Sequence, residues 1–288
     1  MNDQAEALRQ LVKQNNSQSQ LKNTRVVTVT SGKGGVGKSN FSLNFALSLQ
    51  RLGQKVLVFD ADIGMANIDV LMGQTTPYNL YHLLTQEKTI WDIIAVGPEG
   101  LHYIAGGSGF KDLLELTAEQ LERFAGEIEK LHGRYDVILF DTGAGLSKET
   151  VKFITAADET IVVTTPEPTS ITDAYALIKM VRAMHIDVSF KLVVNRATNR
   201  KEGQQTLDKI SLVAKRFLDT ELPSLGIMFD DGNVSSAVKK QIPFSICYPS
   251  TAASKAVMEI ARSFLAIQAP VQQSSGIKGF LSKMFRLA

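Results

Sequence analysis

A glycine-rich stretch with two lysines, residues 31–39, has the spacing that most directly implies chemistry. Residues 32–39 fit the pattern G-x-x-x-x-G-K-[ST], and they lie between a Val- and Thr-rich run and a stretch with helical character. Glycines let successive backbone N–H groups curl around phosphate oxygens, and the start of the following helix adds the positive end of its dipole. The pattern in this setting predicts a phosphate-binding loop rather than a chance glycine-rich turn.

The pattern assigns separate roles to its last two residues. We expect the Lys38 ammonium to contact the β- and γ-phosphates of a nucleotide, and the Ser39 hydroxyl to bind Mg²⁺. The residues expected to hold the nucleotide at this loop are Gly34, Gly35, Val36, Gly37, Lys38, Ser39 and Asn40.

Two further apolar runs end in aspartates. The run 56–59 is followed by Asp60 and then Asp62, and the run 137–140 is followed by Asp141. An aspartate after an apolar run is weak evidence by itself, because polar residues often end strands. Downstream of a phosphate loop it predicts carboxylates at the crevice where open α/β sheets bind their ligands. We therefore expect Asp62 and Asp141 to share the Mg²⁺ site with Ser39.

Short Val- and Ile-rich runs alternate with helical stretches along most of the chain. The runs lie at 26–30, 56–60, 137–140, 160–164 and 191–195, and helical stretches at 41–52, 118–131 and 170–184. Buried strands that alternate with helices indicate a doubly wound, mostly parallel sheet with helices on both faces. We predict a single α/β domain at 24–268.

The composition argues against several classes of protein. Lys and Arg total 31 and Asp and Glu total 29, so the net charge of +2 gives no global attraction to nucleic acid, and no specific nucleic-acid partner is expected. The single cysteine, Cys247, cannot form an internal disulfide or hold a cluster, and it fits a reducing cytoplasm. No run approaches the ~18 apolar residues of a spanning helix, so any membrane contact should be peripheral.

The two ends of the chain differ from this domain. Residues 1–23 read as a short helix at 3–13 and a polar linker, and a second linker at 269–275 precedes a short helical element at 276–288. At 100° per residue, one face of that last element is apolar and the other is basic. The apolar face holds Ile277, Phe280, Leu281, Met284 and Phe285, and the polar face holds Lys278, Ser282, Lys283 and Arg286.

This layout is typical of a helix that lies on an anionic membrane surface. So short a helix is marginal in water, and three basic residues contribute only about 1 kcal/mol each at such a surface. One copy should therefore bind a membrane weakly and reversibly, whereas two copies in a dimer would bind by avidity. The alternative is an amphipathic helix that docks on the domain's own core or on a partner.

The phosphate loop resembles that of a known family. An ordinary phosphate loop does not need Lys33, but residues 32–38 fit the deviant Walker A pattern of the MinD/ParA ATPases. The resemblance implies a P-loop NTPase fold, and an ATP-driven sandwich dimer in which Lys33 reaches the partner subunit's nucleotide. It also implies that Asp62, in a first switch at 60–73, positions the attacking water. Asn195 is similar to the family's adenine-binding asparagine, with Arg196 beside it, although an asparagine after a strand is often only a turn residue.

The N-terminal residues carry a second, more specific resemblance. Asp3, Gln4, Ala5, Leu8 and Arg9 fit the D-Q-A-x-x-L-R segment of the FlhG family (also called FleN or YlxH), MinD-like ATPases that govern flagellar placement and number. In that family the segment stimulates the SRP-type GTPase FlhF, and Gln4 is the residue that would orient water there.

The resemblance to the FlhG family has further implications. They are slow regulatory ATP hydrolysis, reversible attachment to the inner face of the cell membrane, and contacts with flagellar switch-complex proteins. Two alternatives remain open. A MinD-type regulator of cell division would lack the N-terminal segment, and a ParA-type DNA-partition ATPase would need a basic surface.

Overall fold

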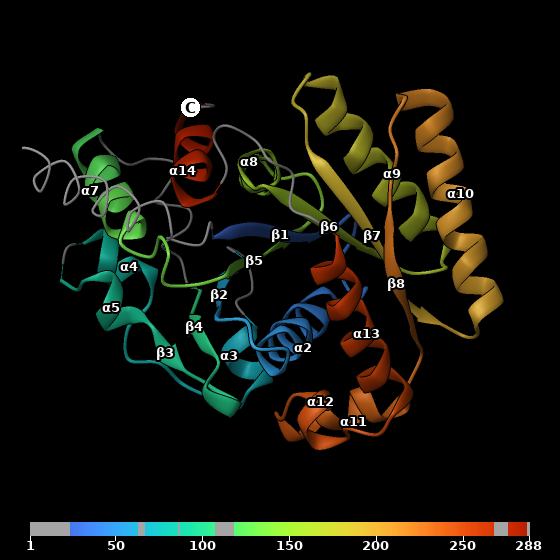
Figure 1. The fold of residues 1–288 in the computed structure, drawn as a ribbon, viewed down its shortest axis with the longest axis horizontal. Helices are drawn as coiled ribbons and strands as arrows, with labels where there is room; N and C mark the ends of the chain where they lie inside the picture. Colours follow the sequence, from blue (N-terminus) through green and yellow to red (C-terminus); the bar gives the residue numbers. More distant parts are fainter. Residues whose placement is uncertain (1–23, 63–66, 86, 107–117, 268–275, 287–288) are drawn as a thin grey trace, which may run out of the picture.

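The centre of the molecule is an eight-stranded β-sheet (Figure 1). The computed structural model describes residues 24–62, 67–85, 87–106, 118–267 and 276–286. The strand order is β3-β4-β2-β5-β1-β6-β7-β8, and every neighbouring pair is parallel except β3 with β4. The strands are β1 (Arg25–Ser31), β2 (Val56–Ala61), β3 (Ala95–Val96), β4 (His102–Ile104), β5 (Val137–Ala144), β6 (Glu159–Thr164), β7 (Ser189–Ala197) and β8 (Ser224–Phe229).

Helices cover both faces of this sheet. In Figure 1, α2 and α13 lie on one face, and α8, α9 and α14 lie on the other. The helices are α2 (Lys38–Arg51), α3 (Ile68–Leu71), α4 (Leu80–Leu84), α5 (Ile90–Ile93), η1 (Pro98–Gly100), α7 (Ala118–Glu129), α8 (Lys148–Ala156), α9 (Pro168–Ala183), α10 (Arg200–Leu218), α11 (Gly232–Lys240), α12 (Phe244–Cys247), α13 (Ala252–Ala266) and α14 (Gly276–Arg286). The predicted doubly wound, mostly parallel α/β fold is confirmed.

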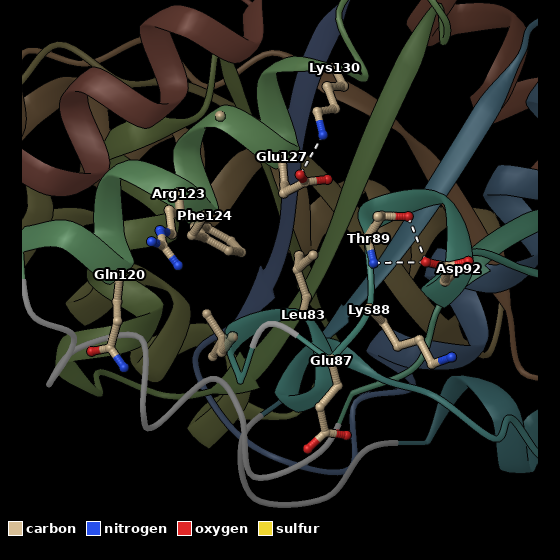
Figure 2. Close-up of a pocket in the computed structure, with 12 residues that line it drawn as sticks. Leu83, Glu87, Lys88, Thr89, Asp92, Gln120, Arg123, Phe124, Glu127 and Lys130 are labelled. Atoms are coloured by element: carbon tan, nitrogen blue, oxygen red, sulfur yellow. Dashed lines mark hydrogen bonds and ion pairs between the residues drawn. The ribbon is translucent and has the colours of Figure 1, made fainter.

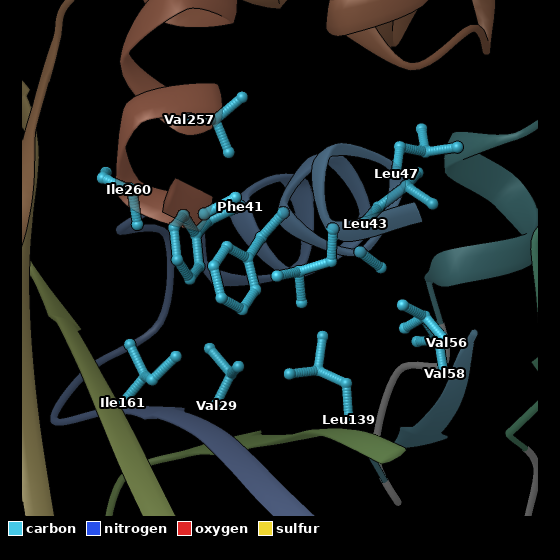
Figure 3. Close-up of a cluster of buried hydrophobic side chains, with 14 of the residues drawn as sticks. Val29, Phe41, Leu43, Leu47, Val56, Val58, Leu139, Ile161, Val257 and Ile260 are labelled. Carbon is cyan, nitrogen blue, oxygen red and sulfur yellow. The ribbon is translucent and has the colours of Figure 1, made fainter. Parts of the chain in front are cut away.

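Alternation along the strands divides the apolar core between the two faces. Val29 and Leu139 point toward α2 and α13, where they meet Phe41 and Val257 in one cluster (Figure 3). Their sequence neighbours on the strands, such as Phe140, belong to a second cluster on the opposite face. Because strands with both faces covered bury every side chain, their sequences read as continuous apolar runs.

The register of the central strands brings the predicted carboxylates to one edge of the sheet. Asp60 of β2 pairs directly with Asp141 of β5, and Ser31 of β1 pairs with Ala144 of the same strand. Since all three strands are parallel, their carboxyl ends meet at the phosphate loop between β1 and α2.

The helix after the loop begins earlier than the sequence analysis placed it. The prediction started it at Phe41, but α2 begins at Lys38, with Gly37 in a left-handed conformation (φ 88°) at its N-cap. Lys38, Ser39 and Asn40 therefore lie in the first helical turn, where free backbone N–H groups point out of the helix end.

The C-terminal helix forms as predicted, but its apolar face is covered. Ile277, Phe280, Leu281 and Met284 are buried in the cluster that contains Phe140. The rings of Phe280 and Phe140 stack with centroids 4.7 Å apart. In this structure α14 therefore packs on its own domain, which is the alternative that the sequence left open.

The polar side of α14 faces outward. Lys278 is exposed and lies 2.8 Å from the Glu129 carboxylate, and Lys283 is half-buried. The side chains of Phe285 and Arg286, the linker residues 269–275 and the N-terminal residues Asp3, Gln4, Leu8 and Arg9 lie outside the part of the chain that the structure describes. Among the described residues, no helix is long and apolar enough to cross a membrane.

Candidate nucleotide site

The phosphate loop is shaped by glycines that no other residue could replace without rearrangement. A Cβ on Gly32 would lie 2.3 Å from the backbone carbonyl carbon of Asp173, so the loop packs directly against α9. Gly37 adopts φ 88°, and a Cβ there would lie 2.4 Å from the Asn195 amide nitrogen. The first contact requires the absence of a side chain, and the second also requires a conformation that L-residues rarely adopt.

Lys38, Ser39 and Asp141 meet at the centre of the site, as predicted. The Lys38 ammonium lies 3.0 Å from Asp141 Oδ2 and 3.3 Å from the Ser39 hydroxyl. Asp141 Oδ1 accepts a hydrogen bond from the Ser42 hydroxyl at 2.5 Å, whereas the buried Oδ2 has only the ion pair with Lys38. A buried carboxylate oxygen with unused acceptor capacity, next to a helix-start hydroxyl, suits the oxygen ligands and bound water that Mg²⁺ requires.

Asp60 has a structural role at this site that the sequence analysis did not assign. Its buried carboxylate accepts hydrogen bonds from the backbone N–H groups of Asp62, Asn67 and Ile68, and thereby holds both ends of the loop after β2. Burial and the neighbouring Asp141 carboxylate raise the pKa of Asp60 to about 7, although the three N–H donors lower it. Its position at a strand end was visible in the sequence, but the hydrogen bonds that it makes to the loop were not.

Asp62 lies at the mouth of a hollow of about 530 Å³ beside the loop. The same hollow is lined by Gly34, Lys38, Ser39 and Asn40, so the structure brings these predicted residues together. Asp62 is half-buried. Its Oδ1 lies 3.5 Å from the position that a Cβ on Gly143, near the end of β5, would occupy. A carboxylate between the phosphate loop and the end of β5 can orient a water beside the terminal phosphate.

Lys33 does not line this hollow. Its ammonium donates to the Glu167 carboxylate at 2.6 Å and to the Thr169 hydroxyl at 2.9 Å, both at the start of α9 in the same chain. The Lys33 ammonium correspondingly lowers the pKa of Glu167. The lysine that distinguishes this loop is thus held to one side of its own phosphate site.

We expect Glu167→Gln to release Lys33 and favour the nucleotide-bound dimer. Because exposed ion pairs are weak, the ATP concentration that gives half-maximal dimer should fall only a few-fold in light-scattering measurements. Asp187→Asn is the matched control, since it removes another exposed pair, Arg182 with Asp187 at 3.1 Å, on the same side of the sheet. Equal dimerisation of both variants and the parent would show that the Glu167 contact does not restrain Lys33.

A second hollow of about 500 Å³ continues from the phosphate loop and suits a nucleotide base. Gly35, Gly37 and Asn40 line both hollows, so the two are adjacent. Asn195 and Arg196, both predicted for the base, line the second one. In this structure the Asn195 amide donates to the Val36 carbonyl oxygen at 2.8 Å.

The far wall of the base hollow comes mainly from residues 228–233, a segment that the sequence places over the base without identifying individual contacts. The wall begins with the last two residues of β8 and continues into α11, and it includes Met228, Phe229, Asp230, Asp231 and Val234. Arg196, with φ 57°, lies 3.5 Å from Asp230 across the rim. The available signal was a polar turn after an apolar run, which is too common to identify a site.

Another hollow lies away from this chemistry, between the α4–α5 segment and α7 (Figure 2). Its walls carry Leu83 and Phe124, and charged residues such as Glu127 and Lys130, which pair with each other. None of the predicted nucleotide residues lines it. We therefore place the nucleotide at the phosphate loop.

Comparison with known proteins agrees with this geometry. The family model described as an AAA domain matches residues 24–194. Antiactivator FleN of Pseudomonas aeruginosa is 35% identical over 260 residues, which cover 90% of this chain and 93% of that protein. Flagellum site-determining protein YlxH of Helicobacter pylori is 37% identical over an alignment of 297 positions that covers 99% of each chain. The chain belongs to the FleN/YlxH family of MinD/ParA-type ATPases.

The chain is also similar to MinD proteins, in sequence and in solved structures. Septum site-determining protein MinD of Bacillus subtilis is 31% identical over 277 residues, which cover 90% of this chain and 97% of that protein. The MinC:MinD cell division protein complex of Aquifex aeolicus superimposes with a TM-score of 0.69 at 25% identity, over 87% of this chain and 99% of that chain. MinD of Pyrococcus horikoshii, solved with Mg-ADP, has the same fold, with a TM-score of 0.69 at 24% identity over 84% of this chain and 97% of that one.

Membership of the FleN/YlxH family makes the protein a nucleotide-binding ATPase. The loop glycines and Lys38 line the hollow where the deviant Walker A pattern predicts the phosphates of ATP.

Proposed function

We propose that this protein is an ATP-switched regulator of flagellar placement and number, whose active form is a sandwich dimer. The observation that carries the proposal is the position of Lys33, which is held by Glu167 and Thr169 outside its own phosphate hollow. A lysine on a loop tip at one side of its own site is well placed to complete the site of a facing copy, where it would stabilise the charge of the transferring phosphoryl group.

Hydrolysis in that dimer would use groups from both chains. Asp62 would orient a water toward the γ-phosphate. The bond between the water oxygen and phosphorus forms as the bond from phosphorus to the leaving oxygen of ADP breaks. Mg²⁺ would supply charge neutralisation between the β- and γ-phosphates, held by Ser39, Asp62 and Asp141. Lys38 of the same chain and Lys33 of the partner would bind the phosphate oxygens, so the reaction would be slow in a monomer.

The dimer would bind an anionic membrane through α14, which requires that α14 leave its docking site. That site is formed in part by Phe140, directly before Asp141, and by Phe153 of α8. The segment between Asp141 and α8 borders the nucleotide hollow through Ala144. Movement of this segment on ATP binding would disturb the surface that holds α14.

Such a release would cost less free energy than exposing α14 to water, because the apolar face of the helix moves from one apolar environment to another, and the remaining cost is exposure of the docking surface that Phe140 and Phe153 form. Ile277, Phe280, Leu281 and Met284 would leave one apolar environment for another, so the burial of about 1.5–3 kcal/mol per side chain is conserved in the exchange. Two released helices in one dimer would then hold the membrane by avidity.

The N-terminal segment would couple the ATP switch to a partner GTPase. Asp3, Gln4, Leu8 and Arg9 match the activating segment of the FlhG family, and the YlxH alignment spans 99% of this chain. Gln4 would orient the attacking water in FlhF. Contacts with flagellar switch-complex proteins are a further part of this proposal.

The experiment that tests the assignment is GTP hydrolysis by FlhF with and without a peptide spanning residues 1–20. We expect stimulation by the parent peptide, and loss of most of it with Gln4→Ala, because a glutamine that orients water acts on the chemical step itself. Gln10→Ala, on the same peptide outside the matched segment, is the control and should stimulate normally.

If neither peptide stimulates FlhF, the flagellar assignment fails, and a MinD-type regulator of cell division becomes the better proposal. That alternative is favoured by the MinD relatives and keeps the ATP switch and the membrane helix. A ParA-type DNA-partition role would instead require DNA binding that weakens steeply with salt.

A further inference from the structure

A hollow of about 440 Å³ lies at the end of the sheet opposite the phosphate loop. Val56, the first residue of β2, and His102, the first residue of β4, form part of its wall. Because β2 runs for six residues, its length of about 20 Å separates this hollow from the end of the strand that leads to Asp62. The hollow is therefore separate from the ATP site.

The most unusual residue of this hollow is Trp91, the second residue of α5. Its side chain is 46% exposed, although tryptophan carries the largest apolar surface of any residue. The guanidinium of Arg134 lies 6.0 Å from the centre of the Trp91 ring. An exposed indole next to a cation presents a flat face on which another ring can stack.

The lining of the hollow is positively charged. Lys55 and Arg134 contribute cations, and among the described residues no aspartate or glutamate lines it. Two acids of neighbouring segments have other partners: Asp136 accepts a hydrogen bond from the Lys55 backbone N–H at 2.8 Å, and Glu99 forms an ion pair with Arg51 at 2.7 Å. The surplus of cations favours an anionic ligand.

Two further side chains give the hollow a fixed polar wall. His102 Nδ1 and the Tyr135 hydroxyl lie 2.7 Å apart, and their rings meet edge to face. Burial raises the pKa of Tyr135 to about 12, so the phenol stays protonated and uncharged. This pair holds the imidazole in place while the amide of Gln54 adds a further hydrogen-bonding group.

We propose that this hollow binds an aromatic anion of the size of a nucleoside monophosphate, with its ring on Trp91 and its anionic group between Lys55 and Arg134. The volume falls in the range of about 300–1,000 Å³ that small-molecule sites occupy. A nucleotide has the required combination of a flat ring and a phosphate, which Arg and Lys bind well.

The sequence provides a direct probe, because Trp91 is the only tryptophan in the chain. We expect GMP to change the indole emission of the full-length protein in a saturable way. Guanosine without phosphate and inorganic phosphate without a ring should each bind at least tenfold more weakly than GMP. N-acetyltryptophanamide, titrated in parallel, corrects for light absorbed by the base.

Two variants test whether the change in emission comes from GMP bound in this hollow. Arg134→Gln should weaken GMP binding at least tenfold while its thermal unfolding midpoint stays at the parent value, since Arg134 is exposed. Arg182→Gln, at a half-buried arginine outside the hollow, should bind GMP as the parent does. Absence of a saturable response, equal binding by Arg134→Gln and Arg182→Gln, or equal binding of phosphate alone would each overturn the proposal.

Discussion

Replacing Asp62 with alanine should lower the hydrolysis rate by about 10²-fold or more, which is the usual loss when a positioned acid–base group is removed, while the phosphate loop still holds ATP. Asp62 borders the phosphate hollow, which the loop glycines, Lys38 and Ser39 also line. Ser39 and Asp141 would remain to hold Mg²⁺. The variant should therefore accumulate as an ATP-bound dimer and co-sediment with anionic vesicles, whereas the parent cycles off them. Phosphate release, light scattering and vesicle co-sedimentation measure the three effects.

The matched control for this experiment is Asp69→Asn. Asp69 belongs to the segment that follows Asp62, and its carboxylate accepts only the neighbouring backbone N–H of Val70 among the bonds resolved there. It should hydrolyse ATP near the parent rate. If the Asp62→Ala protein stayed monomeric and off the vesicles in ATP, the proposed switch would be wrong.

Replacing Lys38 with methionine should have the largest combined effect on binding and stability. Lys38 and Asp141 form an ion pair at 3.0 Å in which both side chains are buried, and Asp60 adds a second carboxylate nearby. Removing one partner of a buried pair costs about 3–5 kcal/mol, because the other charge remains unpaired. We expect chemical denaturation to show that loss in free energy of unfolding, together with at least a 10²-fold weaker affinity for ATP.

The double variant Lys38→Met/Asp141→Asn separates these two effects. With both charges removed, most of the lost stability should return, whereas ATP affinity should remain low because the phosphate ligand is still missing. A Lys38→Met protein as stable as the parent would show that water, rather than Lys38, balances the Asp141 carboxylate.

Most residues of the candidate ATP site could be predicted because they lie close together in the sequence. The loop glycines, Lys38 and Ser39 lie within nine residues, and a strand before them and a helix after them fix their geometry. Asp62 and Asp141 were predictable for a related reason, since parallel strands place their carboxyl ends at one edge of the sheet.

The base hollow could not be completed from the sequence in the same way. Its far wall follows β8, an edge strand whose short apolar run did not stand out, and its residues lie more than 30 positions after Asn195. Only the pairing of β7 with β8 brings Phe229 and Asp230 beside Arg196.

The sequence by itself determined the chemistry of the phosphate loop, the α/β fold and the amphipathic character of α14. Only the tertiary structure decided what each of these elements contacts. Lys33 meets Glu167 across 134 residues, and α14 meets Phe140 across a similar separation. The physical reason is that periodicity specifies which face of an element is apolar or charged, whereas the surface that covers this face depends on the packing of the whole chain.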